Sequence, residues 1–406
     1  MLSFADARKK VIDVVSGLRR VPTTETIQLE NALGRVLAEE VVADRNYPPF
    51  DRATRDGFAV CAADCTNPGT KLRVIGEVQA GGNFARAVCA GECVQIMTGA
   101  AVPRGADAVV MVEHTRQGAA ADEVVMEMAA SAGMNFVAAA SESRAGDVLL
   151  RAQTRMGYAE TSLAAQVGRS ELAVYRVPRI AILSTGNEIV PVSARPGPLE
   201  IRNSNGASLA AQTRLAGGEP VLLGNAPDRA GELRAMCERG LEEDALILSG
   251  GISMGKYDLV EEVLRELGAE FAFDGVAIRP GRPAAFGVCR KKPFFALPGN
   301  PVSTMVTFEL FATAAIDILC GADARPLPFM KARLEKAVDE KAPLTHFLPA
   351  KIEWRNGEAA VSQLPWQGSG DIATLGRGNC FLVVHQEKRR LATGDLVDVL
   401  PRRGLL

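Results

Sequence analysis

The feature that most constrains the fold of this chain is a short apolar run that ends in glycines and leads into a helical pattern. Ala245–Leu248 is uninterrupted apolar sequence, as in the buried strands of parallel sheets. The run ends at Ser249–Gly251, and apolar residues recur with helical spacing from Leu259 to Leu267. Glycines in such a turn let the backbone approach a ligand, and the following helix adds partial positive charge. The pattern predicts either an ordinary strand–helix turn capped by Asp258 or a ligand-binding loop, and the stretch alone favours neither.

Strands and helices alternate in the same way over residues 178–324. Short apolar runs are followed by helical spacing, and Asn300 and Pro301 are residue types typical of a helix cap and a first helical position. This repeat predicts a three-layer α/β domain with a parallel sheet. The expected strands are 179–183, 220–223, 245–248 and 294–297, and the expected helices are 205–216, 228–241, 257–267 and 301–319.

Three of these strands end in polar loops that contain glycine, namely Ser184–Glu188, Ser249–Gly255 and Leu297–Pro301. In an open parallel sheet, ligands bind beyond the carboxyl ends of the strands, so we expect the three loops to meet at one edge. Arg279 and Arg282, each followed by a proline, add two guanidinium groups that suit phosphate. The pattern therefore predicts a phosphorylated ligand at this edge.

Three carboxylates are expected near the same edge, those of Glu188, Asp228 and Asp258. Carboxylates beside a phosphate repel it unless a divalent cation lies between them, and Mg²⁺ binds both kinds of oxygen. We therefore expect Mg²⁺ at this site. The plainer interpretation is a helix cap for each acid and a surface salt bridge for each arginine, and it is their convergence on one edge that favours a ligand site.

The remainder of the chain differs in pattern from the α/β segment. A chain of 406 residues is too long for one hydrophobic core. A helix capped by Ser3 is expected at 3–16, a strand at 23–29 and a second helix at 30–42, and two adjacent prolines then end the pattern. Short alternating strands separated by turn residues follow. The predicted organisation is 1–46 with 144–177 as a discontinuous helical and strand domain, 47–143 as an inserted β domain, 178–324 as the α/β domain and 325–406 as a small all-β domain.

The composition argues against several classes of function. The chain is 47% apolar and 23% charged with a formal net charge of −2, so nucleic acid and anionic membranes are not expected as partners. No apolar run predicts a membrane span, and the N-terminus does not have the pattern of a secretory signal, so we expect a cytoplasmic protein. Two C-x3-C pairs, Cys61/Cys65 and Cys89/Cys93, are compatible with zinc, but their strand-like surroundings favour buried free thiols.

These loops, in this order along the chain, resemble the MoeA/gephyrin family of molybdopterin molybdenumtransferases. The matching stretches run from the N-terminal region to the C-terminal region, and as a set they are specific, although a single piece such as TGA is not. They are DGFAV (56–60), TGAAVPRGADAVV (98–110), STGNEIV (184–190), NSN (203–205), SGGISMGKYD (249–258), RPGRP (279–283), LPGNPVS (297–303) and QGSG (367–370).

The resemblance implies a multidomain α/β fold. Its parts are a helical and strand domain, an inserted β domain, a central three-layer α/β molybdopterin-binding domain and a C-terminal β-barrel-like domain. It also implies an elongated homodimer in which the α/β domain of one subunit faces the inserted domain of the other. The implied reaction takes adenylylated molybdopterin and molybdate, inserts the metal at the dithiolene and releases AMP. An adenylyltransferase and molybdoenzymes are the implied protein partners.

The resemblance also implies roles for individual residues. Asp56, Glu188, Asp228 and Asp258 are implied as catalytic residues, and the last three also as metal ligands for Mg²⁺. The two arginines of RPGRP stand where the family usually has lysines. The implied substrate-binding residues are Thr98, Ser184, Thr185, Gly186, Ser249, Gly250, Gly251, Ser253, Gly255, Arg279, Arg282, Pro298, Gly299, Asn300 and Ser369.

Some positions depart from the family pattern. Asn187 and Asn203 stand where the family usually has Asp, Arg229 replaces an acid, and Ala138–Glu142 replaces an R-x-x-G-E-D segment. Because Asn lacks the charge of Asp, metal and molybdate affinity could fall. The departures motivate an alternative, a non-catalytic paralogue that acts as a molybdopterin-binding or partner-binding dimeric scaffold. A nucleotide-phosphate hydrolase built on the same α/β domain is a further alternative, against which the flanking domains argue.

Overall fold

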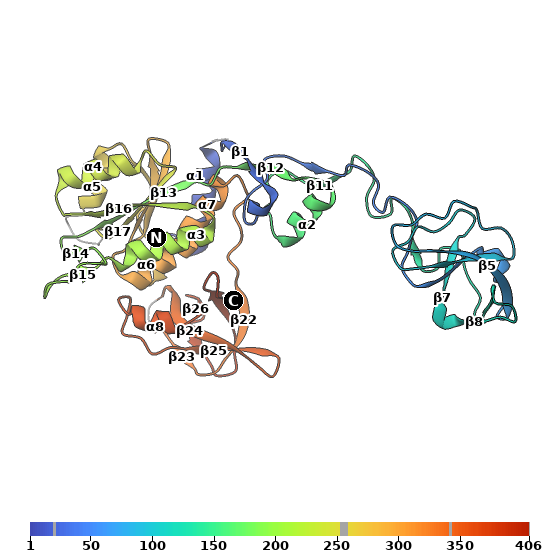
Figure 1. The fold of residues 1–406 in the computed structure, drawn as a ribbon. Helices are drawn as coiled ribbons and strands as arrows, with labels where there is room; N and C mark the ends of the chain where they lie inside the picture. The colour runs from blue at the N-terminus through green and yellow to red at the C-terminus, as the bar shows by residue number, and fades with distance from the viewer. Residues whose placement is uncertain (19–21, 252–258, 341–342, 406) are drawn as a thin grey trace. The chain divides into compact units, whose positions relative to one another are not determined.

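The computed structural model describes residues 1–18, 22–251, 259–340 and 343–405, which form two compact units (Figure 1). The first, which we call the large unit, comprises Met1–Glu39, Gln153–Gly157 and Glu171–Leu406. The second, the small unit, comprises Glu40–Ala152 and Tyr158–Ser170. The expected α/β and C-terminal regions both belong to the large unit, and the finer division into four domains stays a prediction.

A six-stranded sheet forms the centre of the large unit, in the order β16-β13-β17-β21-β20-β18. The first four strands are parallel, as the alternating pattern predicts, whereas β20 pairs antiparallel with β21 and β18 pairs antiparallel with β20. Neither antiparallel pairing was predicted. That of β20 with β21 follows from the two-residue turn at Arg290 and Lys291, where both φ angles are positive (50° and 63°), as in type I′ hairpin turns. The strands are β13 (Arg179–Thr185), β16 (Glu219–Ala226), β17 (Ala245–Ser249), β18 (Glu270–Phe273), β20 (Ala285–Cys289) and β21 (Lys292–Leu297).

Helices cover both faces of this sheet, which confirms the three-layer prediction (Figure 1). Alternate residues of β13 point to opposite faces. Ile180 and Ile182 pack in one core with Leu209 and Val302, and Leu183 packs in the other core with Leu233. The first face carries α1 (Phe4–Gly17), α3 (Ser204–Ala216), α6 (Pro301–Thr307), the π-helical turn η4 (Phe308–Ala312) and α7 (Thr313–Leu319), and the second carries α4 (Ala230–Gly240) and α5 (Leu259–Glu266).

The segment Pro301–Leu319 forms the continuous helical run that the sequence predicts. Asn300 occupies the cap position and Pro301 the first turn, although the Asn300 side chain makes no capping hydrogen bond. By length and composition alone this helix could cross a membrane, but 83% of its most apolar window is buried inside the protein. It is therefore a core helix.

The C-terminal strands close into a barrel. β24 pairs with β25, β25 with β22, β22 with β28, β28 with β26 and β26 with β24, so the ring has no open edge. An Asn356-Gly357 turn joins β24 to β25, with both residues at positive φ, and this residue pair is typical of hairpin turns. The elements are β22 (Met330–Leu334), β23 (Val338–Asp339), β24 (Thr345–Arg355), β25 (Glu358–Gln363), α8 (Ile372–Arg377), β26 (Cys380–Val384), β27 (Arg390–Leu391) and β28 (Leu396–Pro401).

The N-terminal segment bears out part of the sequence analysis. The Ser3 Oγ caps α1 by accepting the Asp6 backbone N–H, and the expected strand is β1 (Thr24–Gln28), paired with β12 (Glu171–Tyr175). The expected helix at 30–42 is wrong, because the segment begins with a 3₁₀ turn, η1 (Leu29–Asn31), and ends in the short strand β2 (Val41–Val42). Gly34 takes a left-handed φ of 79°, and beyond it the backbone N–H of Leu37 donates to Thr154 instead of to its own preceding turn.

The small unit is built on a mostly antiparallel six-stranded sheet in the order β7-β4-β6-β5-β9-β8. The short strands expected from the sequence are present, and Cys65 and Cys93 are buried in its core, whereas Cys89 is exposed. Burial raises the pKa of the Cys93 thiol to about 12. The elements are β2 (Val41–Val42), β3 (Arg52–Ala53), β4 (Gly57–Val60), η2 (Ala62–Asp64), β5 (Thr70–Val78), β6 (Glu92–Ile96), β7 (Ala108–Met111), η3 (Val112–His114), β8 (Thr115–Gln117), β9 (Glu123–Met126), β10 (Phe136–Val137), β11 (Val148–Leu150) and α2 (Tyr158–Gln166).

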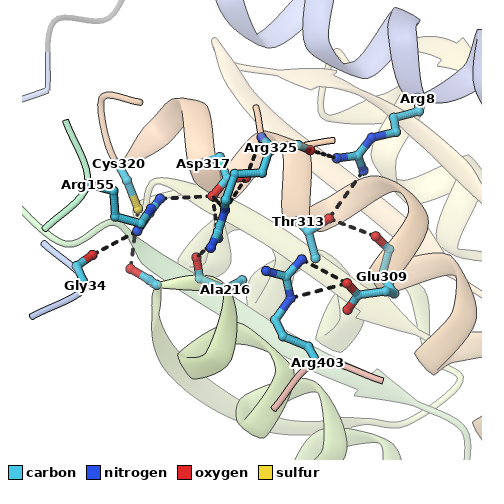
Figure 2. A network of polar contacts seen from close by, with 11 residues as sticks. Arg8, Gly34, Arg155, Ala216, Glu309, Thr313, Asp317, Cys320, Arg325 and Arg403 are labelled. Carbon is cyan, nitrogen blue, oxygen red and sulfur yellow. Dashed lines mark hydrogen bonds and ion pairs between the residues drawn. The ribbon is translucent and has the colours of Figure 1, made fainter. Parts of the chain in front are cut away.

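A buried network of charged side chains joins distant segments of the large unit (Figure 2). Asp317 on α7 accepts hydrogen bonds from Arg155 (3.0 Å) and Arg325 (2.6 Å). Glu309 in the π-helical turn accepts one from Arg403 near the C-terminus (2.9 Å). Arg8 of α1 donates to the Leu310 carbonyl oxygen in the same turn (2.6 Å). The network therefore ties α1, the central helix and the C-terminal strands together, and none of it was predicted from the sequence.

Candidate functional site

The loops that follow β13, β17 and β21 border one pocket of about 920 Å³. These strands are neighbours in the parallel part of the sheet, so their carboxyl ends meet at one edge. The pocket is lined by Ser184, Thr185, Gly186, Glu188, Ile189, Ile201, Arg202, Asn203, Ser204, Asn205, Asp228, Ser249, Gly250, Gly251, Leu259, Gly299, Asn300, Pro301, Gly370 and Ile372. All of them belong to the large unit.

Asn203 stabilises the side of the pocket that lies next to α3. Its Oδ1 accepts the backbone N–H of Gly206 (2.8 Å), which caps α3, and the hydroxyl of Ser184 (2.9 Å). An Asp at this position would accept the same two hydrogen bonds. The departure from the usual Asp therefore keeps these contacts and removes only the charge.

Asn205 connects two of the loops. Its Nδ2 donates to the Ser249 hydroxyl at the end of β17 (2.7 Å) and to the Gly299 carbonyl oxygen in the loop after β21 (2.7 Å). Asn205 belongs to the NSN stretch, but it was not among the site residues predicted from the sequence. Its place at the start of a helix facing a glycine loop was the signal that could have identified it.

The two glycines after β17 are required by close backbone packing. Gly250 and Gly251 have φ angles of 96° and 66°, which favour glycine. A Cβ on Gly250 would lie 2.6 Å from the Thr185 carbonyl oxygen, and one on Gly251 would lie 2.5 Å from Val260 Cγ2. The turn therefore reaches the β13 loop only because it lacks side chains.

The acidic side of the pocket is exposed to solvent. Glu188 and Asp228 both line the pocket, and both residues are exposed. Asp228 is held by Asn187, whose backbone N–H donates to Asp228 Oδ2 (3.3 Å) and whose side-chain oxygen accepts the Asp228 N–H (3.0 Å). Asn187 thus positions Asp228 and adds no third charge.

These two carboxylates fit Mg²⁺ in part. Mg²⁺ is commonly held by one or two carboxylates together with water and substrate phosphate oxygens, which matches an open rim with two acids. Among the described residues, no group of three or more His, Cys, Asp or Glu side chains is placed to hold a metal by itself. The other predicted acid, Asp258, and two predicted substrate-binding residues, Ser253 and Gly255, lie outside the described residues.

The structure does not place the two predicted arginines at this pocket. Arg279 ends β19 (Ile278–Arg279), which pairs with β24 of the barrel, and the Arg282 carbonyl oxygen accepts the Val276 N–H. Neither is among the described residues that line the pocket. Arg202, at the end of β15 (Ile201–Arg202), does line it, and its Nε donates to the Ala194 carbonyl oxygen (3.0 Å). Sequence reasoning missed this arginine because β14 (Ile189–Val190) and β15 are too short to show a pattern.

The remaining predicted residues of the large unit lie at or next to the pocket. Gly299 and Asn300 line it, while Pro298 is buried and accepts the Thr304 hydroxyl through its carbonyl oxygen. The Ser369 carbonyl oxygen accepts the Val302 N–H at the start of α6 (2.9 Å). Since Gly370 and Ile372 line the pocket, a loop of the barrel completes it.

Asp56 and Thr98 meet on the small unit. Asp56 Oδ1 accepts the Thr98 backbone N–H (2.6 Å) and its hydroxyl (2.8 Å). These two hydrogen bonds hold the pKa of the exposed Asp56 carboxyl below its ordinary value. Asp56 is therefore an ionised, oriented carboxylate at neutral pH.

Models of three protein regions match the chain. They are the MoeA N-terminal region (domain I and II) at residues 2–168, a probable molybdopterin-binding domain at 181–317, and the MoeA C-terminal region (domain IV) at 331–401.

Characterised relatives and solved structures match over nearly the whole chain. The molybdopterin molybdenumtransferase of Bacillus subtilis is 33% identical over 93% of this chain and 89% of its own length. That of Staphylococcus aureus is 30% identical over 92% of this chain and 90% of its own. A crystal structure of a molybdopterin biosynthesis MoeA protein from Pyrococcus horikoshii OT3 covers 99% of this chain and 100% of its own, with a TM-score of 0.81 and 27% identity. A second MoeA crystal structure from the same species has a TM-score of 0.75 at 32% identity, over 97% of this chain and 98% of its own.

Proposed function

The chain belongs to the MoeA family of molybdopterin molybdenumtransferases, and we propose that its pocket is where it inserts molybdenum into molybdopterin. It is a transferase of molybdenum cofactor biosynthesis. The substrates that we propose are adenylylated molybdopterin and molybdate, and the released product is AMP. The observation that carries the proposal is the convergence of three glycine-bearing loops on one pocket of about 920 Å³, which is large enough for a pterin with its phosphate.

The pocket suits a ligand with anionic groups. The N-termini of α3 and α6 both border it, through Asn203–Asn205 and Asn300–Pro301. Helix N-termini favour negative charge, because their first backbone N–H groups and the helix dipole face the ligand. Arg202 adds a cationic side chain at the rim. Arg279 and Arg282 do not line this pocket, and their assignment to phosphate stays a prediction.

The main role of the protein in this reaction is to position two anions. In the proposed reaction the phosphoanhydride of the adenylylated substrate is hydrolysed to AMP and the molybdopterin phosphate, and the molybdenum of molybdate bonds to the dithiolene sulfurs. Molybdate and the phosphoanhydride are both anions, so their approach must overcome charge repulsion. The loops of the pocket orient the substrate, and the Asn187 contact holds Asp228 at the rim. Glu188 and Asp228 would hold Mg²⁺, which would neutralise phosphate charge at that edge.

The departures from the family pattern do not favour the non-catalytic alternative. Asn203 keeps the cap of α3 and the contact to Ser184, and Asn187 keeps Asp228 in place. The positions therefore retain their geometry with fewer charges. We expect an active enzyme that needs a higher Mg²⁺ concentration for full activity than an Asn187→Asp variant does.

Further parts of the proposal rest on the family resemblance alone. We propose that the protein is a homodimer, that Asp56 and Thr98 act in catalysis and substrate binding, and that it works in the cytoplasm. Its substrate would come from an adenylyltransferase, and its product would pass to molybdoenzymes. Light scattering on the purified protein tests the dimer, because a mass of a single 43.1 kDa chain would contradict it.

A direct assay tests the proposed reaction. Purified protein is incubated with adenylylated molybdopterin, molybdate and Mg²⁺, and AMP is measured by chromatography. We expect AMP release that depends on molybdate. Bound ligand with no AMP above the protein-free control would reject the reaction and support the scaffold alternative.

A further inference from the structure

Two buried oxygen atoms at the pocket have no hydrogen-bond partner among the residues that the structure describes. They are Oγ1 of Thr185 and Oδ1 of Asn205, and both residues line the pocket. Thr185 is only 5% exposed. A buried polar atom without a partner lowers the stability of the free protein, so such atoms call for an explanation. A ligand that supplies the missing hydrogen bonds is one such explanation.

The chemistry of Asn205 restricts what that ligand can be. Both hydrogens of its Nδ2 are used, one by the Ser249 hydroxyl and one by the Gly299 carbonyl oxygen. The reverse orientation of the amide would set Oδ1 against that carbonyl oxygen, so Oδ1 must face the other way. Asn205 therefore offers only a hydrogen-bond acceptor. An acceptor binds an N–H or O–H group and repels a phosphate or molybdate oxygen.

The two oxygen atoms lie around the same piece of backbone. A Cβ on Gly250 would be 3.0 Å from Thr185 Oγ1, and a Cβ on Gly299 would be 3.4 Å from Gly250 Cα. The Gly299 carbonyl oxygen is the one that accepts from Asn205. Thr185 is thus next to Gly250, and Asn205 is hydrogen-bonded to Gly299, which is itself next to Gly250.

We propose that Asn205 and Thr185 bind the N–H edge of the pterin ring. A pterin presents its 2-amino group beside a ring N–H, and these adjacent donors match Asn205 Oδ1 and Thr185 Oγ1. The anionic groups of the substrate would then lie toward the rim with Glu188, Asp228 and Arg202. This assignment rests on the proposed function, and it adds Asn205 to the site as a residue that determines ring specificity.

Thr185→Val is the variant that separates binding from structure. It replaces the hydroxyl by a methyl group of similar size and breaks no hydrogen bond to a described residue, because Oγ1 has no partner among them. We expect unchanged or higher thermal stability of the free protein and roughly three- to tenfold weaker binding of 6-hydroxymethylpterin, measured by ligand-observed NMR. Thr185→Ser, which keeps the hydroxyl, should restore affinity. A structural role alone would instead lower stability and leave pterin affinity unchanged.

The chain provides a matched control. Thr213 on α3 is also fully buried with an unpartnered Oγ1, but it does not line the pocket. Thr213→Val should shift stability in the same direction as Thr185→Val and leave pterin affinity unchanged. AMP binding should be unchanged in both variants. If Thr185→Val weakened AMP binding and spared pterin binding, the two oxygens would bind adenine and the proposal would be overturned.

A pair of ligands tests the specificity itself. 6-Hydroxymethyllumazine carries oxygen where the pterin carries its 2-amino group, so it presents an acceptor to Asn205. The wild-type protein should prefer the pterin by about tenfold or more, and Asn205→Ala should lose the preference. Equal affinity of the wild type for both ligands would overturn the inference even if molybdate-dependent AMP release were observed. Pterin preference without AMP release would instead reject the proposed reaction and support the binding assignment.

Discussion

Asp317→Asn tests whether the buried charge network holds the large unit together. Asp317 lies on α7 with its side chain 1% exposed. Its carboxylate accepts hydrogen bonds from Arg155 (3.0 Å), from the Arg325 side chain (2.6 Å) and from the Arg325 backbone N–H (3.0 Å) (Figure 2). Asn has the same size but no charge, so the change removes the anion without creating a cavity. We expect a loss of stability that comes from the two arginines left without their counter-ion.

The size of the expected loss in stability depends on how deeply Arg155 and Arg325 are buried. Removing one partner of a buried ion pair costs about 3–5 kcal/mol, because the remaining charge is left unpaired. Here the Arg155 and Arg325 side chains are 21% and 38% exposed, so water can solvate the released guanidinium groups. We therefore reduce the expected loss in the free energy of unfolding to about 2–3 kcal/mol. Arg155→Met should cost less, because Asp317 keeps its contacts with Arg325.

Urea unfolding followed by tryptophan fluorescence measures this loss. Both tryptophans, Trp354 and Trp366, belong to the large unit, so the signal reports on the unit that contains the network. The midpoint should fall by about 1 M for a dependence of about 2–3 kcal/mol per M. Glu232→Gln is the control, since its pair with Arg229 is exposed and contributes about 0.5 kcal/mol at most. A midpoint for Asp317→Asn equal to that of the control would refute the reasoning.

Three other perturbations follow from local contacts. Thr98→Val removes one of the two hydrogen bonds to Asp56, so the pKa of that carboxyl should rise but stay below its ordinary value, which an NMR titration would measure. The ionised Asp56 stabilises the folded state at pH values above its unfolded pKa. In the variant this stabilisation should be lost at a higher pH than in the wild type as the pH is lowered. At pH 8 a thiol reagent should label exposed Cys89 in the folded protein and spare Cys93, because burial raises the Cys93 pKa to about 12. Gly250→Ala should weaken ligand binding and destabilise the large unit by more than about 1 kcal/mol, because the new Cβ meets the β13 loop.

Each of these has a contrary outcome and a control. An unchanged Asp56 pKa in Thr98→Val would show that the hydroxyl does not bind the carboxylate. Rapid labelling of Cys93 before unfolding would contradict its burial. Gly357→Ala is the matched control for Gly250→Ala, because Gly357 also has positive φ (84°) but no atom near the added Cβ. Equal costs for the two changes would mean that the contact with the β13 loop is unimportant.

The sequence predicts the sheet and its loops because these depend on local pattern. Apolar runs followed by glycines mark β13, β17 and β21, and the order of parallel strands then fixes the edge at which their loops meet. The expected helix at 30–42 failed for the opposite reason. Its apolar spacing suits a helix, but its backbone pairs with segments more than a hundred residues away, such as Thr154. Such long-range pairing leaves no trace in a local pattern.

The composition of the site was harder to predict than its place. Glu188 and Asp228 follow strands of the sheet, and both line the pocket. Arg279 instead ends β19, which pairs with the barrel strand β24, and it does not line the pocket. Arg202 and Asn205 line the pocket because of how α3 and the preceding strands β14 and β15 pack. The unpartnered oxygens of Thr185 and Asn205 are properties of packing alone. No residue pattern shows that a buried atom lacks a partner.

Molybdate-dependent AMP release by a Glu188→Gln, Asp228→Asn double variant is the most direct test of the central claim. If the reaction takes place in this pocket, the double variant should still bind 6-hydroxymethylpterin, since its changes lie on the acidic rim, and its rate should fall by at least about a hundredfold. Raising Mg²⁺ should not restore that rate. Turnover equal to that of the wild type would place the chemistry elsewhere in the molecule and contradict the account.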